Sequence, residues 1–433
     1  MIKAARNYLV FLWRCATLAL EGDWRYYSWV GLLTLVCLLG LNAYAKQLVH
    51  GLAITDMTDQ VSWGVYITNF TFVVGIAASA VMMVIPVYVY KNKDLHDLVI
   101  FGQLLAVAGI IMALAFVTVD IGRPDRFWHL IPGVGKLNFP GSMLSWDVIV
   151  LNGYLLLNVY ISGYLIYSRY RNRMPAPWFY VPFVFIAIVW AFSTKTVCSF
   201  LYVGLGGRPF WNSAIVGPRF IASAFTSGPA LIILALQVIR RLTDYRITDR
   251  ALFTLRSIVQ VSMLVNVFLL FNELFKEFYT GNLHSSSARY LFFGLHGHHA
   301  LVPWIWTAVA FNLIAMVLLV IPLSRSLKWL DLACVLAVVG IWIEKGMGIV
   351  VPGFVPTPLG EVVEYSPTLN ETLICLGIWA FGFLCYTLFL RMAVPVLQGR
   401  VTQSNEADWI AHGHPHLGAR LGAGTPSSQP SKG

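Results

Sequence analysis

The chain has 433 residues, of which 58% are hydrophobic and only 12% are charged, and its mean hydropathy is +0.70. A soluble protein of this length has too little interior to hide so much apolar side-chain surface. The formal net charge is +10, but the basic residues lie between apolar runs and form no single patch. The composition therefore predicts an integral membrane protein. The charge is interpreted as a topology signal, and no nucleic-acid partner is expected.

Ten apolar stretches are long enough to cross the hydrocarbon core, which takes about 20 residues of helix. They cover residues 29–45, 63–90, 98–119, 146–167, 178–202, 220–239, 255–275, 300–323, 330–350 and 369–394. The first 28 residues are a mixed, partly amphipathic segment, and no cleavable signal peptide precedes the first span. The expected fold class is an all-α polytopic membrane protein with ten transmembrane helices. The second to ninth spans would form two four-helix bundles, flanked by the first and last.

Lysine and arginine residues are unevenly divided between the two ends of the spans. Counted on alternate sides, the richer set includes both chain termini, so the positive-inside rule places both termini in the cytoplasm. Three regions follow: a cytoplasmic segment 1–28, a membrane domain 29–395 and a cytoplasmic tail 396–433. The composition of the tail predicts disorder. His412, His414 and His416 alternate within it, but a solvated tail is favoured over a metal site.

The connections on the outer side are longer than the inner ones and carry most of the glycine, proline, histidine and aromatic residues. Long ordered loops commonly carry function. Ionisable residues in or next to the spans gather toward the same side. These residues are Asp120, Arg123, Asp147, Lys195, Glu273, Glu277, Glu344, Lys345 and Glu371.

A charge in hydrocarbon is costly, so each of these residues is a candidate functional group. Together they predict a polar cavity that opens toward the outer face. The inner half offers mainly amides, so a continuous proton path would need amides and water there. The alternative is that the groups pair structurally, for example Lys195 with Glu273 or Glu344.

The placement of histidine and cysteine argues against resident metal cofactors. No histidine lies well inside a span, which disfavours a bis-histidine haem at mid-membrane. The six cysteines include no C-x-x-C pair, so an iron–sulfur cluster is not expected. The GLHGHH run at 294–299 is interpreted as a polar loop in preference to a metal site. A quinone site needs less: an apolar slot, aromatic walls and a group that exchanges protons. The predicted outer cavity would supply all three.

Several motifs resemble the NrfD/PsrC family of quinone-reactive membrane subunits, over about residues 20–395. They are WGVYITNFTFVVGIA (63–77), DIGRPDRFWH (120–129), SWDVIVLNGYLLLN (145–158) and VPGFVPTPLGEVVEYSPTLNE (351–371). The ten-span length is similar to the longer branch of the family. The combination of DIGRPDRFWHL, LNFPGSMLSWDV and LHGHHALVPWIW most resembles DsrP-type subunits of sulfite-reduction complexes.

The resemblance implies a multi-pass subunit of the cytoplasmic membrane without haem or iron–sulfur cluster. It would bind menaquinone or menaquinol near the periplasmic face and exchange electrons with a ferredoxin-like iron–sulfur subunit docked there. A multihaem cytochrome c and further membrane and cytoplasmic subunits would complete the complex, which would serve sulfite or sulfate metabolism. Some relatives carry a histidine late in the first motif. Ala77 and Ala78 occupy that region here, so another group must contact the quinone.

Nine residues are therefore the candidate site. The carboxylates proposed for proton exchange are Asp120, Asp147, Glu273 and Glu344. The residues proposed to hold the quinone are Asn69, Arg123, His129, Trp146 and Lys195. Arg123 is expected to order Asp120 or a quinone carbonyl, since its charge is fixed.

Three alternatives remain open. A structural anchor would have these carboxylates paired in a dry interior. A solute carrier would have a mid-membrane cavity with alternating access. The chain could also be the equivalent subunit of a cytochrome c:menaquinone oxidoreductase.

Overall fold

The computed structural model describes residues 2–78, 80–279, 281 and 285–404, and these residues fold into helices joined by loops, with no β-strand beyond two isolated bridges. The α-helices are α1 (Ile2–Leu20), α2 (Trp24–His50), α3 (Val65–Ala78), α4 (Val81–Tyr88), α5 (Val99–Asp120), α6 (Met143–Tyr170), α7 (Pro177–Val203), α8 (Val216–Leu242), α9 (Asp249–Tyr279), α10 (Ser286–Phe293), α11 (Val302–Val320), α12 (Leu327–Lys345) and α13 (Leu369–Leu397). Short 3₁₀ helices are η1 (Gly51–Ile54), η2 (His96–Leu98), η3 (Pro124–Leu130) and η5 (Pro322–Arg325). The three tail histidines lie outside the described residues.

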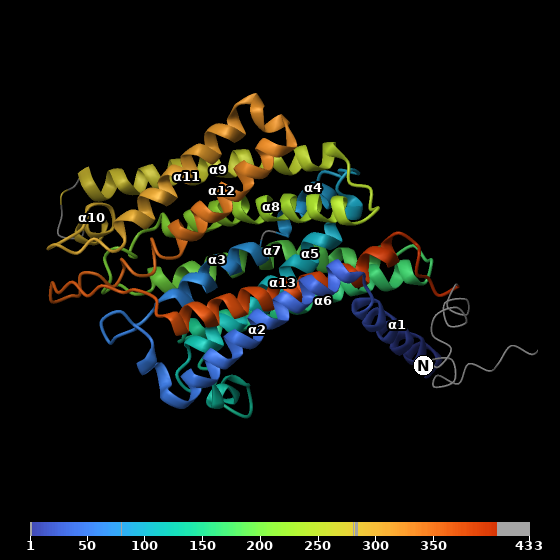
Figure 1. Cartoon of the computed structure of the whole chain (residues 1–433), viewed down its shortest axis with the longest axis horizontal. Coiled ribbons are helices and arrows are strands. Elements are labelled where there is room, and N and C mark those ends of the chain that lie inside the picture. Colours follow the sequence, from blue (N-terminus) through green and yellow to red (C-terminus); the bar gives the residue numbers. More distant parts are fainter. Residues whose placement is uncertain (1, 79, 280, 282–284, 405–433) are drawn as a thin grey trace, which may run out of the picture.

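The long helices run side by side along the longest axis of the molecule (Figure 1). Helices α3, α5, α6 and α7 pack into one bundle, which also includes the short α4, and helices α8, α9, α11 and α12 pack into the other. Helices α2 and α13 lie against each other, and α13 also packs on α5 of the first bundle. The expected all-α polytopic fold is confirmed.

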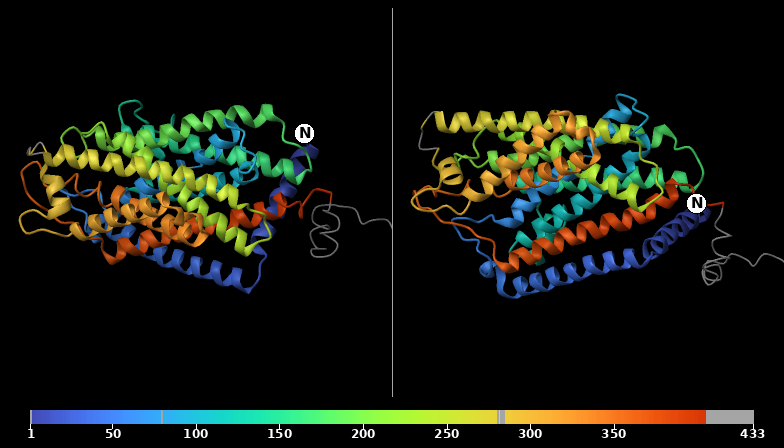
Figure 2. Two further views of the ribbon diagram at one scale, coloured as in Figure 1. Left: turned by 90° about the horizontal axis from the view of Figure 1, so that it is seen from above. Right: turned by 45° about the horizontal axis from the view of Figure 1, so that its top comes forward.

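Both ends of the described chain lie at the same end of the molecule (Figures 1 and 2). We call this the inner end, because the charge bias predicts that it faces the cytoplasm, and the opposite end the outer end.

Nine helical segments of the described chain are long and apolar enough to cross a membrane. The expected span 63–90 corresponds to α3 and α4 together. The expected ninth span corresponds to α12, which has 19 residues and lies outside these nine because it carries four charged residues, Lys328, Asp331, Glu344 and Lys345. Helix α12 packs along both α11 and α8, so these charges belong to a helix inside the second bundle.

The contact between α2 and α13 depends on two glycines. A Cβ atom built on Gly40 would lie 2.6 Å from the Cα atom of Gly377, and one built on Gly377 would lie 2.7 Å from the Cα atom of Gly40. The two backbones therefore touch, as small residues allow in membrane helix pairs. The two helices run side by side in both Figure 1 and the right view of Figure 2.

The start of α13 is fixed by local sequence. The hydroxyl of Thr368 accepts a hydrogen bond from the Glu371 backbone N–H at 3.2 Å, and the Glu371 carboxylate accepts one from the Thr368 N–H at 2.9 Å. This reciprocal capping box satisfies two backbone donors that a helix start otherwise leaves free. It also positions the Glu371 carboxylate at the outer end of the first bundle.

Candidate functional site

Buried polar side chains gather in the outermost turns of the long helices, as the sequence predicted. Asp147 and Glu371 lie near the outer starts of α6 and α13, and Lys195, Glu273 and Glu344 lie near the outer ends of α7, α9 and α12. All five are at most 5% exposed. Together with Arg219, Asn69 and Asp120, the buried polar residues form four groups, which we call the Arg219 cluster, the Lys195 centre, the Asn69 centre and the acidic pair.

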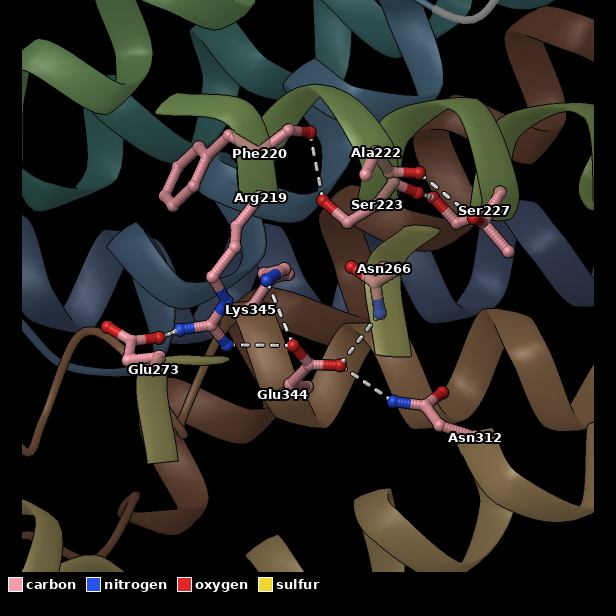
Figure 3. A network of polar contacts seen from close by, with 11 residues as sticks. Arg219, Phe220, Ala222, Ser223, Ser227, Asn266, Glu273, Asn312, Glu344 and Lys345 are labelled. Atoms are coloured by element: carbon pink, nitrogen blue, oxygen red, sulfur yellow. Dashed lines mark hydrogen bonds and ion pairs between the residues drawn. The ribbon is translucent and has the colours of Figure 1, made fainter. Parts of the chain in front are cut away.

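The Arg219 cluster lies inside the second bundle (Figure 3). The Arg219 guanidinium donates to Glu344 Oε1 at 2.9 Å and forms an ion pair with Glu273, and Lys345 Nζ lies 2.9 Å from Glu344 Oε1. The other carboxylate oxygen of Glu344 accepts from Asn266 at 3.2 Å and from Asn312 at 2.7 Å. Two positive and two negative groups therefore balance, and Glu344 is saturated with donors.

A small cavity lies beside the Arg219 cluster. The volume open to the centre of a water molecule is about 20 Å³, and its walls include Arg219, Glu273, Glu277 and Phe292. This is room for about one water molecule, since a single water needs roughly 10–15 Å³ measured in this way. The cavity has no space for a quinone ring, so Glu273 and Glu344 lie in a site suited to charge pairing.

The Lys195 centre includes residues of α3, α6, α7 and α8. Lys195 Nζ donates to the Thr71 backbone carbonyl at 2.8 Å and lies 5.1 Å from the centre of the Phe220 ring. The Thr71 and Tyr202 hydroxyls are 2.5 Å apart. Lys195 is therefore not paired with Glu273 or Glu344, because Arg219 takes that place.

Asp147 is the carboxylate that interacts electrostatically with Lys195. It is 4% exposed, and its buried Oδ1 atom has no hydrogen-bond partner among the described residues. Further along the same face of α6 follow Tyr154, Asn158 and Ser162, all buried. These are hydroxyl and amide groups, so on α6 the inner half offers no carboxylate, as expected from the sequence.

The Asn69 centre joins the two bundles. The indole N–H groups of Trp342 and Trp379 both donate to Asn69 Oδ1, at 3.0 and 2.8 Å. The Asn69 amide nitrogen donates to the Val65 carbonyl at 2.8 Å and lies 3.6 Å from the Cys375 sulfur. Every polar atom of the Asn69 side chain therefore has a partner, and its role in the structure is to orient the two indoles.

The two indoles open onto the outside of the molecule. Trp342 and Trp379 are only half-buried; Trp304 packs on the first at a ring-centre distance of 6.1 Å, and Phe383 packs on the second at 5.8 Å. Trp304 is 40% and Phe383 39% exposed. We call these four residues the aromatic seam. Helix α3, which carries Asn69, packs against both α12 and α13.

An acidic pair lies on the outer side of the aromatic seam. Glu371 and Asp120 interact electrostatically with each other and with the Tyr66 hydroxyl. Glu371 is fully buried and accepts hydrogen bonds from the Tyr365 hydroxyl at 2.7 Å and from the Asp56 backbone N–H at 3.1 Å. In contrast, the buried Oδ1 atom of Asp120 has no hydrogen-bond partner in the described part of the chain.

Three of the predicted quinone contacts lie on the outer surface, away from these centres. Arg123 donates two hydrogen bonds to Asp125, at 2.9 and 2.8 Å, rather than to Asp120, and this ion pair lowers the pKa of Asp125. His129 is exposed and packs on the Trp128 ring. The indole N–H of Trp146 donates to the Pro140 carbonyl at 2.9 Å. The hydrogen bonds of Arg123 and Trp146 thus go to residues of the outer loop, and His129 packs on its neighbour in that loop.

The sequence reading missed Arg219 as a buried group. The expected sixth span began at residue 220 and left Arg219 in the outer loop, but α8 begins at Val216, so Arg219 lies in its first turn and is 4% exposed. It also missed Trp342 and Trp379 as partners of Asn69. The sequence held an indication of each. Two carboxylates inside spans, Glu273 and Glu344, need a cation as partner, and the oxygen of a buried asparagine needs hydrogen-bond donors.

The fold and these centres define a polytopic membrane subunit with acid–base groups concentrated near one face. The family described as "Polysulphide reductase, NrfD" matches residues 53–356, and the chain belongs to this family.

The chain is 26% identical to a putative membrane subunit of dimethyl sulfoxide reductase from Halobacterium salinarum, over 84% of this chain and 90% of that protein. It is 24% identical to an Hdr-like menaquinol oxidoreductase integral membrane subunit of Archaeoglobus fulgidus, over 86% and 94%. It is 25% identical to a menaquinone reductase integral membrane subunit of Nitratidesulfovibrio vulgaris, over 54% and 58%. The chain is thus an integral membrane subunit of the type found in quinone-interacting oxidoreductase complexes.

Proposed function

We propose that menaquinol or menaquinone binds at the aromatic seam, with its ring near Trp342 and Trp379. The observation that carries this proposal is the pair of half-buried indoles held by one oxygen of Asn69. Quinone sites are lined by apolar and aromatic groups with a few placed polar atoms. The aromatic seam offers such walls on the outside of the molecule, where a lipid-soluble ligand can enter from the bilayer.

The acidic pair supplies the acid–base group that the chemistry needs. A bound menaquinol would release two electrons and two protons. Asp120 Oδ1 lacks a hydrogen-bond partner among the described residues and is therefore free to take up a proton. Glu371, hydrogen-bonded to the Asp56 N–H in the outer loop, would hold the next proton on the way to the outer surface. Run in the opposite direction, the same groups would deliver protons to a quinone.

The four predicted carboxylates then have different roles. Asp120 is the proposed proton acceptor, and Asp147 is a reserve acceptor at the Lys195 centre. Glu273 and Glu344 balance Arg219 and hold the second bundle together. Lys195 would keep the region between the bundles positive, and Asn69 would orient the seam without contacting the quinone. Arg123, His129 and Trp146 would contribute to the outer surface where a partner docks.

We further propose the partners and the pathway that the motif resemblance implies. Electrons would pass to a ferredoxin-like iron–sulfur subunit at the outer, periplasmic end of a protein embedded in the cytoplasmic membrane. A multihaem cytochrome c and other membrane and cytoplasmic subunits would belong to the same complex, which would serve dissimilatory sulfur metabolism as DsrP-type subunits do. The equivalent role in a cytochrome c:menaquinone oxidoreductase uses the same site.

A structural anchor without quinone chemistry is the second candidate. It is favoured by the saturated Arg219 cluster, in which the charges are paired as that hypothesis predicts. It is disfavoured by Asp120 and Asp147, which each bury an oxygen without a partner among the described residues. An anchor has no reason to retain two such groups, because each buried polar atom without a partner lowers the free energy of unfolding and so destabilises the fold.

Photoaffinity labelling tests the proposed site directly. The purified complex would be illuminated with an azido-menaquinone, and the labelled peptides identified by mass spectrometry. We expect labels on the outer parts of α12 and α13, which carry Trp342 and Trp379, and competition by unlabelled menaquinone. Trp379→Leu should weaken labelling, whereas Trp329→Leu, an exposed tryptophan at the inner end of α12, should leave it unchanged. Labels confined to other helices would reject the site, and no competable label would favour the anchor.

A further inference from the structure

Helix α1 packs against the inner end of the membrane domain with one face. Phe11, Cys15 and Ala19 are buried there, and the Phe11 ring lies 5.1 Å from that of Tyr167 and 5.0 Å from that of Tyr170 in α6. The buried Arg14 guanidinium donates to the Thr402 carbonyl at 2.8 Å, which ties α1 to the chain that follows α13. The helix is therefore a fixed part of the domain.

The opposite face of α1 is apolar and exposed. It presents Leu9, Leu12, Trp13 and Leu20, which are 44–71% exposed, and Ala16 lies between them at helical spacing. These positions follow the i, i+3, i+4, i+7 pattern of a single helix face. Exposing this apolar face to water would be unfavourable, so we expect lipid or another protein to cover it.

The short connection between α1 and α2 fixes how deep the exposed face of α1 lies relative to the membrane. Only residues 21–23 separate the two helices, and the hydroxyls of Tyr26 and Tyr27 donate to the carbonyls of Ala19 and Leu20 in the last turn of α1. Arg391 of α13 donates to the Glu21 carbonyl at 2.8 Å. The end of α1 is thus held at the level where the span α2 enters the membrane.

The surroundings of this connection are those of a membrane–water boundary. Trp24, Tyr27 and Trp29 of α2 are exposed, as are the basic residues Arg6 and Arg25. Exposed tryptophan and tyrosine mark the boundary in membrane proteins, and basic residues there attract anionic lipid headgroups. The exposed face of α1 therefore lies beside lipid at the depth where amphipathic helices bind.

We propose that α1 is an interfacial helix, whose face of Leu9, Leu12, Trp13, Ala16 and Leu20 is covered by bilayer lipid at the inner membrane surface. In this position α1 clamps the start of the C-terminal tail to the membrane through Arg14 and Thr402. The proposal is independent of the quinone chemistry, because α1 lies at the inner end of the molecule (Figures 1 and 2), whereas Trp342 lies in the last turn of α12.

Spin labels on single cysteines test the lipid contact in the full-length protein. Half-buried Cys37 and Cys385 would be replaced by alanine, and nitroxides placed at Leu9→Cys, Leu12→Cys or Ala16→Cys. The protein would be reconstituted in nanodiscs of phosphatidylethanolamine and phosphatidylglycerol. Leu38→Cys on the exposed face of α2 is the lipid reference, and Lys93→Cys, exposed in the loop after α4, is the water reference.

We expect the three α1 labels to collide with oxygen more than with a water-soluble nickel complex, as the label at position 38 does. Collisions dominated by nickel, as at position 93, would overturn the proposal. The same labels would be measured in the purified complex, where exclusion of both oxygen and nickel would also overturn the proposal, because a protein partner would then cover the face. Thermal unfolding of each variant would identify any substitution that disturbs α1 itself.

Discussion

Trp342 and Trp379 donate their indole N–H groups to the same oxygen atom of Asn69, although the two tryptophans belong to helices that pack in different parts of the molecule. One amide thus sets the distance between α12 and α13. Because both indoles are half-buried, the same contact that joins the helices also forms the wall of the proposed quinone site.

Replacing Asn69 by leucine should loosen this contact. Two indole donors would lose their acceptor, and each unsatisfied buried donor costs about 1–3 kcal/mol in proteins, with membrane pairs at the lower end. We expect a lower thermal unfolding temperature in detergent and a changed near-ultraviolet circular dichroism signal from the indoles. Asn152→Leu is the matched control, since the Asn152 amide is exposed and bonds to its own helix. Equal effects of both variants would contradict the assigned role.

Asp120→Asn should lower quinol oxidation without preventing assembly. Proton transfer by a positioned side chain typically contributes about 10²–10⁴-fold, and an amide cannot take the proton. We expect a loss of at least the lower end of that range, measured as electron transfer from a menaquinol analogue in the purified complex. Asp125→Asn changes the same residue type in the exposed η3 and should retain activity. An assembled Asp120→Asn complex with normal turnover would remove Asp120 from the mechanism.

The stability of the Arg219 cluster should depend on whether its positive and negative charges balance, more than on how many charges it contains. Glu344→Gln leaves two cations against Glu273 alone, and breaking a buried pair costs about 3–5 kcal/mol. The double variant Glu344→Leu with Lys345→Leu keeps Arg219 opposite Glu273 and removes one charge of each sign. We expect the double variant to unfold at a higher temperature than Glu344→Gln. If it were the less stable of the two, charge balance would not explain the cluster.

Gly377→Val should separate α2 from α13. The added side chain would meet the backbone of Gly40, which cannot move aside as a flexible side chain can. Overpacking of this kind costs about 1–3 kcal/mol, occasionally more. Gly31→Val in α2 is the control, because no atom lies within 4 Å of a Cβ built there. The two variants would be compared by thermal unfolding and by protease sensitivity of the loop that follows α2.

The positions of the helices, and the end of the helices at which the buried charged residues lie, could be predicted from the sequence, because both depend on local composition. Apolar runs mark the spans, and Asp147, Lys195, Glu273 and Glu344 are visible within them whatever their partners. The helix boundaries were less predictable. Residues 216–219 form the first turn of α8, and Arg219 is buried there against Glu273 of α9 and Glu344 of α12.

The partners of the polar groups could not be predicted, since pairing depends on which helices become neighbours. The alternative of structural pairing put Lys195 opposite Glu273 or Glu344, but α7 places it against α3, where it bonds to the Thr71 carbonyl. Asn69 was expected to contact the quinone, whereas two indoles more than 270 residues away in the chain occupy its oxygen. Neither relationship leaves a pattern in the linear sequence.

The backbone contact between Gly40 and Gly377 also limits the order in which the domain can be completed during synthesis. Chains emerge from the ribosome N-terminus first, so α2 enters the membrane long before α13 exists. Both bundles are synthesised in the interval, and α2 must wait in the bilayer with its glycine face open to lipid. Only the insertion of the last span closes the structure. A chain truncated before α13 would therefore leave the first span with its glycine contact unmade, held to the first bundle by the hydrogen bonds that Gln47 forms with α3 and α5, and expose it to membrane quality control.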